Sequence, residues 1–116
     1  MSEPIAIDLP HGASVVVNES EWTELASAKW NRLEDDGYIQ WTQTVSRHED
    51  GRILVYVVLL PASGILKTAG EILPAGSKEV AAVVERLAEQ FDVPTNLSHA
   101  CIEGFNRASR EFKAPT

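Results

Sequence analysis

The chain has 116 residues, of which 44% are hydrophobic and 23% charged, and this composition excludes disorder as a description of the whole chain. Its net charge of −7 disfavours binding to the phosphates of nucleic acid. The single cysteine, Cys101, excludes an internal disulfide framework and favours a reducing compartment. We therefore expect one compact domain over residues 1–116 that does not bind nucleic acid directly.

No segment of the sequence has the pattern of a secretory signal or a membrane span. Residues 1–20 contain no basic start followed by an apolar stretch. The longest apolar run, residues 53–60, is less than half of the ~20 residues that a spanning helix needs. These observations predict a cytoplasmic protein without membrane contact, with loose ends only at residues 1–3 and 114–116.

The amino-terminal segment is predicted to form a β-hairpin. Residues 5–9 alternate apolar with other side chains, residues 14–17 are rich in valine, and Pro10-His11-Gly12 separates the two runs. A short connection that contains proline and glycine between two such runs is typical of a hairpin turn.

A helix is predicted over about residues 18–35. Asn18 and Glu21 have the spacing of a capping box, and Gly37 is placed to end the helix in a left-handed conformation. The apolar side chains fall on one stripe of a 3.6-residue wheel. This stripe consists of Trp22, Leu25, Ala26, Trp30 and Leu33.

Three strands are predicted next, over residues 38–47, 53–60 and 65–73, as an antiparallel meander. The middle strand is an uninterrupted apolar run, which is typical of a strand covered on both faces. In the first strand Trp41 and Val45 share one face, whereas Thr42 and Thr44 share a polar face. Gly70 in the third strand indicates a bulge or the close approach of another segment.

Two helices are predicted to close the chain, one that begins near Ser77 and one that follows Pro94. In the last helix Ala100, Gly104 and Ala108 recur at four-residue spacing, which lets another backbone come close. The fold class expected from the whole pattern is α+β, with the order ββαβββαα around one mostly antiparallel sheet.

The ionisable residues do not form a recognisable catalytic or metal-binding motif. His99 and Glu103 lie four apart on the last predicted helix, but a metal site needs further ligands that the sequence does not place. Cys101 and His99 point about 200° apart around a helix, so they do not make a nucleophile and its base. We expect no cofactor and no bound metal, and a binding function in preference to catalysis.

The leading hypothesis for function is a non-enzymatic interaction domain that associates with itself. It is motivated by the two-sided apolar strand and by the small residues of the last helix. The candidate interface residues are Trp41, Tyr56, Ala100, Gly104 and Ala108.

Two other hypotheses remain open. An acidic inhibitor or immunity-type module would bind a basic protein partner through a negative face around the first predicted helix, formed by Glu21, Glu24 and Glu34. A small-molecule binder or small enzyme would have a pocket between that helix and the sheet. The residues that would line this pocket are Trp22, Lys29, Trp30 and Trp41.

Overall fold

The computed structural model describes residues 5–18, 20–35, 37–62 and 64–112. The ends that the sequence predicts to be loose lie outside these ranges. The described chain contains six strands, a short 3-10 turn and two helices. Their bounds are β1 Ile5–Asp8, η1 Pro10–Gly12, β2 Ser14–Val17, β3 Trp22–Glu34, β4 Gly37–His48, β5 Ile53–Leu60, β6 Lys67–Leu73, α1 Val80–Gln90 and α2 Thr95–Phe112.

Strands β3 to β6 form a four-stranded antiparallel sheet in the order β3-β4-β5-β6. The apolar run of the sequence is β5, which lies inside the sheet between β4 and β6. The predicted meander of three strands is therefore confirmed, with a fourth strand added at its β4 edge.

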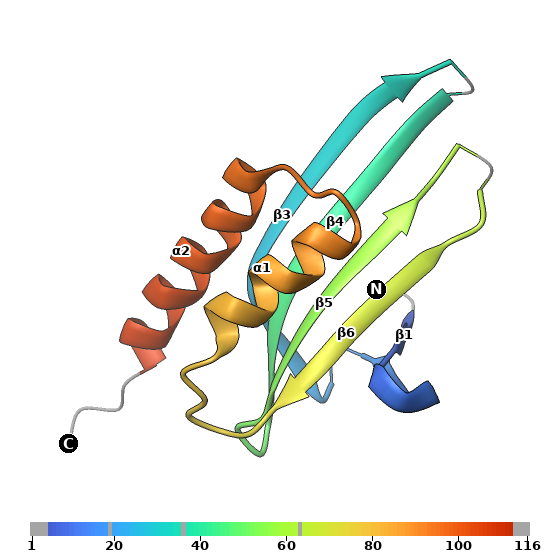
Figure 1. Cartoon of the computed structure of the whole chain (residues 1–116). Helices are drawn as coiled ribbons and strands as arrows, with labels where there is room; N and C mark the ends of the chain where they lie inside the picture. Colours follow the sequence, from blue (N-terminus) through green and yellow to red (C-terminus); the bar gives the residue numbers. More distant parts are fainter. Residues whose placement is uncertain (1–4, 19, 36, 63, 113–116) are drawn as a thin grey trace.

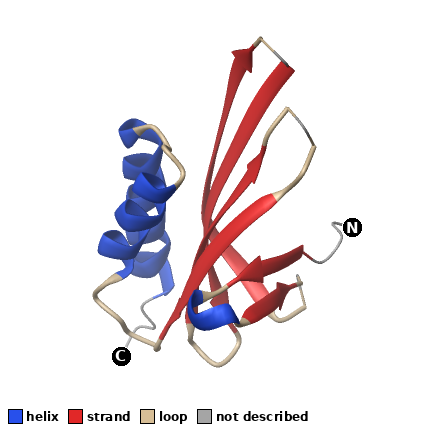
Figure 2. Cartoon of the chain, turned by 45° about the vertical axis from the view of Figure 1, so that its right-hand side comes forward, coloured by secondary structure: helices blue, strands red, loops and turns tan. Residues whose placement is uncertain are grey.

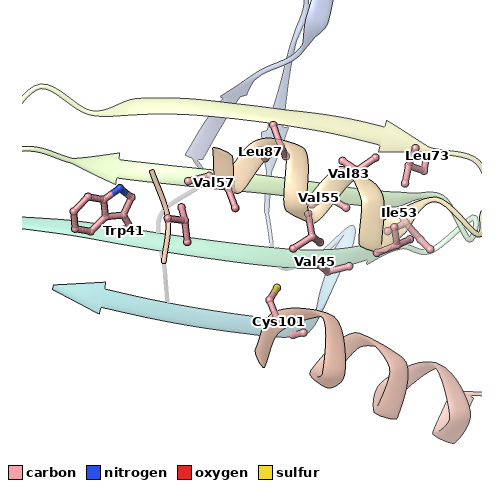
Figure 3. Packing of buried hydrophobic residues seen from close by; sticks show 14 residues of the cluster. Trp41, Val45, Ile53, Val55, Val57, Leu73, Val83, Leu87 and Cys101 are labelled. Atoms are coloured by element: carbon pink, nitrogen blue, oxygen red, sulfur yellow. The ribbon is translucent and has the colours of Figure 1, made fainter. Parts of the chain in front are cut away.

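Both helices cover the same face of this sheet (Figures 1 and 2). Side chains from α1, α2 and the covered faces of β4 and β5 fill the space between the layers (Figure 3). Gln43 of β4 is a buried polar residue on this side, and its Nε2 donates to the carbonyl oxygen of Val84 over 2.8 Å. The Arg86 guanidinium on α1 also pairs with the Glu71 carboxylate on β6.

The β1–β2 hairpin forms a separate two-stranded sheet on the opposite face of the main sheet (Figure 2). The backbone N–H of Asp8 donates to Oγ1 of Thr68 over 3.0 Å. Ile7, which is fully buried, lies directly over Gly70, where a Cβ atom would come within 2.7 Å of Cγ2 of Ile7. The close approach predicted at Gly70 is thereby confirmed, and the approaching segment is β1.

The predicted helix over residues 18–35 is wrong, because this segment forms β3, a strand of 13 residues paired with β4. The register shifts between Glu24 and Ala26, so one extra residue is accommodated there as a β-bulge. The bulge places Trp22 on one face of the sheet and Trp30 on the other, and it breaks the strict alternation by which a strand is recognised. The apolar residues before and after the bulge therefore follow one another at three- and four-residue intervals, as they would on one side of a helix.

The capping signal at Asn18 is present, but it stabilises a turn that leads into a strand. Oδ1 of Asn18 accepts from the backbone N–H of Glu21 over 3.1 Å, and the Asn18 carbonyl oxygen accepts from the N–H of Trp22 over 3.0 Å. Gly37, at φ 127°, lies at the β3–β4 turn and not after a helix. The described order is thus ββββββαα, with two antiparallel sheets and two helices in an α+β fold.

Candidate functional site

The face of the main sheet opposite the helices, which we call the open face, carries most of the polar side chains of β3 and β4. The register places Glu24, Ser27 and Lys29 of β3 opposite Ser46, Thr44 and Thr42 of β4. On the other side of β4, Tyr56 of β5 lies opposite Thr44, and Val58 lies opposite Thr42. Three strands therefore supply a continuous surface that the helices do not reach.

The amino-terminal hairpin turns part of this surface into a groove of about 450 Å³. Ile5, Val17 and Asn18 form one wall, and the strands form the floor. This volume is within the range of small-molecule sites. The groove is lined by Ile5, Val17, Asn18, Trp22, Glu24, Ser27, Lys29, Thr42, Thr44, Ser46, Tyr56 and Val58.

The floor of the groove is a set of hydroxyl groups. Oγ of Ser27 and Oγ1 of Thr44 are 3.3 Å apart, and Thr44 and Ser46 are buried. Burial raises the pKa of the Tyr56 phenol, hydrogen bonds with the side chains of Thr44 and Ser46 lower it, and the charge of Glu24 raises it. The phenol is therefore neutral at physiological pH and available as a hydrogen-bond donor or acceptor.

Two opposite charges stand along the β3 side of the groove. Glu24 and Lys29 are both exposed, and they pair with Ser46 and Thr42, which are four residues apart on β4. At ~3.3 Å per residue, the Cα atoms of Thr42 and Ser46 are about 13 Å apart, and the register gives the same separation for Lys29 and Glu24. Within the described part of the chain, neither charge has an ion-pair partner, so both are available to a ligand.

Trp22 closes the groove beyond Glu24. Its indole ring packs edge-on against the imidazole of His48, with centroids 4.9 Å apart, and Cζ of Arg52 lies 5.9 Å from the ring centroid. These contacts leave Trp22 only 4% exposed. The ring is a fixed wall, because its neighbours hold it on two sides.

A second surface lies at the end of the sheet where the β3–β4 turn and the β5–β6 connection meet (Figure 1). A Cβ atom at Gly37 would lie 3.5 Å from Cβ of Ala62, so the two connections pack together. Large apolar side chains are exposed around them, and we call this group the distal patch. It consists of Leu33, Tyr38, Leu60, Ile65 and Leu66. Trp30 is also exposed, but it pairs with Trp41 on the helix-covered face and does not belong to this patch.

The residues predicted to line a ligand pocket are divided between the two faces of the sheet. Trp22 and Lys29 line the groove on the open face. Trp41 is buried on the helix-covered face, where its Nε1 donates to the carbonyl oxygen of Phe91 over 2.8 Å, and Trp30 pairs with it on that same face. The predicted pocket between a helix and the sheet has no counterpart here, because the segment that carries Trp22 and Trp30 is itself a strand of the sheet.

The other predicted site residues are also scattered. Gly104 on α2 faces β3, where a Cβ atom would meet Cβ of Ala26 at 3.0 Å, while Ala100 is exposed and Ala108 half-buried. Tyr56 lies in the groove. Of the predicted acidic face, Glu21 and Glu24 are exposed; Glu34 belongs to β3, but its side chain lies outside the described part.

Cys101 is buried and its Sγ donates to the carbonyl oxygen of Gln43 over 3.7 Å. Burial raises the pKa of this thiol to about 12, and the charge of Glu24 acts in the same direction. The thiol is therefore protonated and unreactive at neutral pH.

The β4–β5 turn gathers three charged or ionisable side chains. Nδ1 of His48 lies 3.0 Å from Oδ1 of Asp50, and the Arg52 guanidinium donates to Oδ2 of Asp50 over 2.8 Å. The backbone N–H of Arg52 is the main cause that lowers the pKa of Asp50. These contacts stabilise a hairpin turn, and among the described residues no group of three potential ligands is arranged to hold a metal ion.

No protein family, no curated protein and no solved structure matches this chain. Neither described helix is long and apolar enough to cross a membrane.

Sequence reasoning found part of the groove and missed the rest. The polar face of β4, with Thr42 and Thr44, is recognisable from simple alternation. The helical interpretation places Ser27 on a solvent face, and no local signal shows that Ile5 and Val17 line the same groove as the strands of the main sheet. If the segment is treated as two strands that meet at Leu25, each with side chains alternating between the faces, Ser27 falls on the polar face together with Lys29.

Proposed function

We propose that the protein is a non-enzymatic interaction domain that associates with a second copy of itself through the distal patch. The observation that supports this proposal is the grouping of exposed apolar side chains at one end of the molecule. Leu33 and Tyr38 are each 66% exposed and directly opposite each other in the β3–β4 register. Large exposed apolar side chains that gather at one end of a molecule are typical of an interaction site.

The shape of the patch suits contact with an identical surface. Leu33, Tyr38 and Leu60 lie on the open face at the end of the long β3–β4 hairpin, away from both helices (Figure 2). A two-fold axis through this end would bring each patch onto its counterpart, as in most homodimers. Burial of these side chains supplies the free energy of association, since each loses apolar surface to water.

The net charge of −7 on each copy opposes association. Added salt screens this repulsion, so self-association through the patch strengthens as the ionic strength rises. Binding of a basic partner by the acidic side chains would weaken under the same change, which separates the two hypotheses.

The test is size-exclusion chromatography with light scattering at micromolar concentration. The wild-type protein should elute with a mass that is a multiple of 12.7 kDa, and the double variant Leu33→Ser/Tyr38→Ser should elute as a monomer. Val16→Ser is the matched control, because Val16 is an exposed apolar residue on the amino-terminal hairpin, outside the patch. A monomeric wild type, or equal effects of the patch and control variants, would exclude the proposal.

A further inference from the structure

We infer that the groove on the open face binds a short peptide with free termini, two or three residues long, whose amino group meets Glu24 and whose carboxylate meets Lys29. This inference does not depend on self-association, because the groove and the distal patch share no lining residue. It rests on the charges, hydroxyl groups and walls of the groove.

The charges define the class of ligand. Glu24 repels a ligand that is anionic throughout, such as a nucleotide, and Lys29 repels one that is cationic throughout. Neither charge is neutralised within the described part of the chain. A molecule with a positive and a negative end satisfies both residues at once.

The spacing defines the length of the ligand. Two extended residues span about 7 Å and three span about 10 Å, and a hydrogen bond of ~3 Å at each end brings these lengths to about 13 Å and 16 Å. The Cα atoms of Glu24 and Lys29 are about 13 Å apart by their strand register, and the two flexible side chains can lean apart by the ~3 Å that a tripeptide adds. A free amino acid is too short to reach both groups.

The floor and walls suit the remainder of a peptide. Between the two charges Ser27 is exposed and Tyr56 half-buried, and their hydroxyl groups can donate to peptide carbonyl groups and accept from peptide N–H groups. Thr44, which is only 1% exposed, lies beneath them, with its Oγ1 3.3 Å from Oγ of Ser27. Ile5 and Val17 offer an apolar wall to one side chain of the ligand. Small side chains are favoured, because the groove of about 450 Å³ must also hold the peptide backbone.

The test is isothermal titration calorimetry with three probes: tri-alanine, N-acetyl-tri-alanine and tri-alanine amide. The wild-type protein should bind tri-alanine and lose about tenfold or more in affinity for each blocked probe, since each block removes one charge-assisted hydrogen bond. Lys29→Met should bind tri-alanine and its amide equally, and Glu24→Gln should bind tri-alanine and its acetylated form equally. A variant that is merely unfolded would lose affinity for all three probes, so the insensitivity of each variant to one particular blocked end distinguishes a binding role from a loss of folding.

Lys67→Met and Glu85→Gln are the matched controls, because both residues are exposed and lie outside the groove. They should bind all three probes as the wild type does. The inference is overturned if tri-alanine does not bind at millimolar concentration, if the blocked probes bind the wild type equally well, or if Lys29→Met behaves like Lys67→Met. Light scattering of Lys29→Met and Glu24→Gln should show the wild-type mass, which separates a failure of the groove from a failure of the patch.

Discussion

The two faces of the main sheet are built from the same strands and have opposite properties. On the helix-covered face Val45, Val55 and Val57 are all buried in one apolar layer (Figure 3). On the open face coverage decreases along β5, from Leu54 at 0% exposed to Leu60 at 37%. The hairpin covers only part of this face, so β5 contributes to a core on one side and to a graded surface on the other.

This difference shows that a continuous apolar strand indicates two apolar faces but does not determine what covers them. The helices bury the middle of one face, where Val45, Val55 and Val57 are 0% exposed, whereas a hairpin of two four-residue strands covers only part of the other. Both proposed contacts, self-association through the distal patch and peptide binding in the groove, use side chains of the open face. Three sets of variants test this difference between the faces, and the expected changes in stability decrease from the first to the last.

The largest effect is expected from a matched pair of leucines on the open face. Leu54→Ala should lower the free energy of unfolding by about 3 kcal/mol, because it leaves a cavity beneath covered surface. Leu60→Ala should lower it by less than about 0.5 kcal/mol, since its side chain already meets solvent. Urea denaturation of dilute protein measures both, and equal losses would contradict the gradient of coverage.

Gly70→Ala tests how the hairpin is seated on the sheet. The new methyl group would meet Cγ2 of Ile7 at 2.7 Å and the backbone oxygen of Val55 at 3.0 Å, so the free energy of unfolding should fall by about 1–3 kcal/mol. In the double variant Ile7→Ala/Gly70→Ala, the cost should be less than the sum of the two single changes. Strict additivity, measured by the same denaturation series, would show that Ile7 does not lie over Gly70.

The smallest effect is expected at alkaline pH, where one titrating group on each side of the sheet contributes. The pKa of Cys101 is raised from 9.0 to about 12, so its stabilising contribution is complete below pH 9 and is lost as the pH rises toward 12. Tyr56, on the open face, has a raised pKa as well, and its contribution is lost above pH 10. The loss for one group is at most about 1.4 kcal/mol per pH unit.

Cys101→Ala and Tyr56→Phe should each reduce the fall in stability above pH 9 that the wild type shows, with the larger reduction for Cys101→Ala. Thermal denaturation from pH 8 to 11 provides the comparison. A wild-type slope that neither variant changes would show that these groups titrate equally in the folded and unfolded chain.

Much of the fold is predictable from the sequence because its signals are local. The stripe of Val80, Val83 and Leu87 identifies α1, and the turn at Asp50-Gly51 identifies the β4–β5 hairpin. The bulge near Leu25 is different, because it arises from pairing with β4 and leaves only a disturbed period in the sequence. The groove depends on that same pairing and on a hairpin far away in the chain, so only two of the four predicted pocket residues lie in it.

The most direct test of the open face as the contact surface is a dilution series followed by two-dimensional amide NMR, from millimolar to low micromolar protein. We predict that the signals of residues around Leu33, Tyr38 and Leu60 shift with concentration while those of α1 and α2 stay unchanged. Shifts confined to the exposed sides of the two helices would contradict the assignment of self-association to the open face.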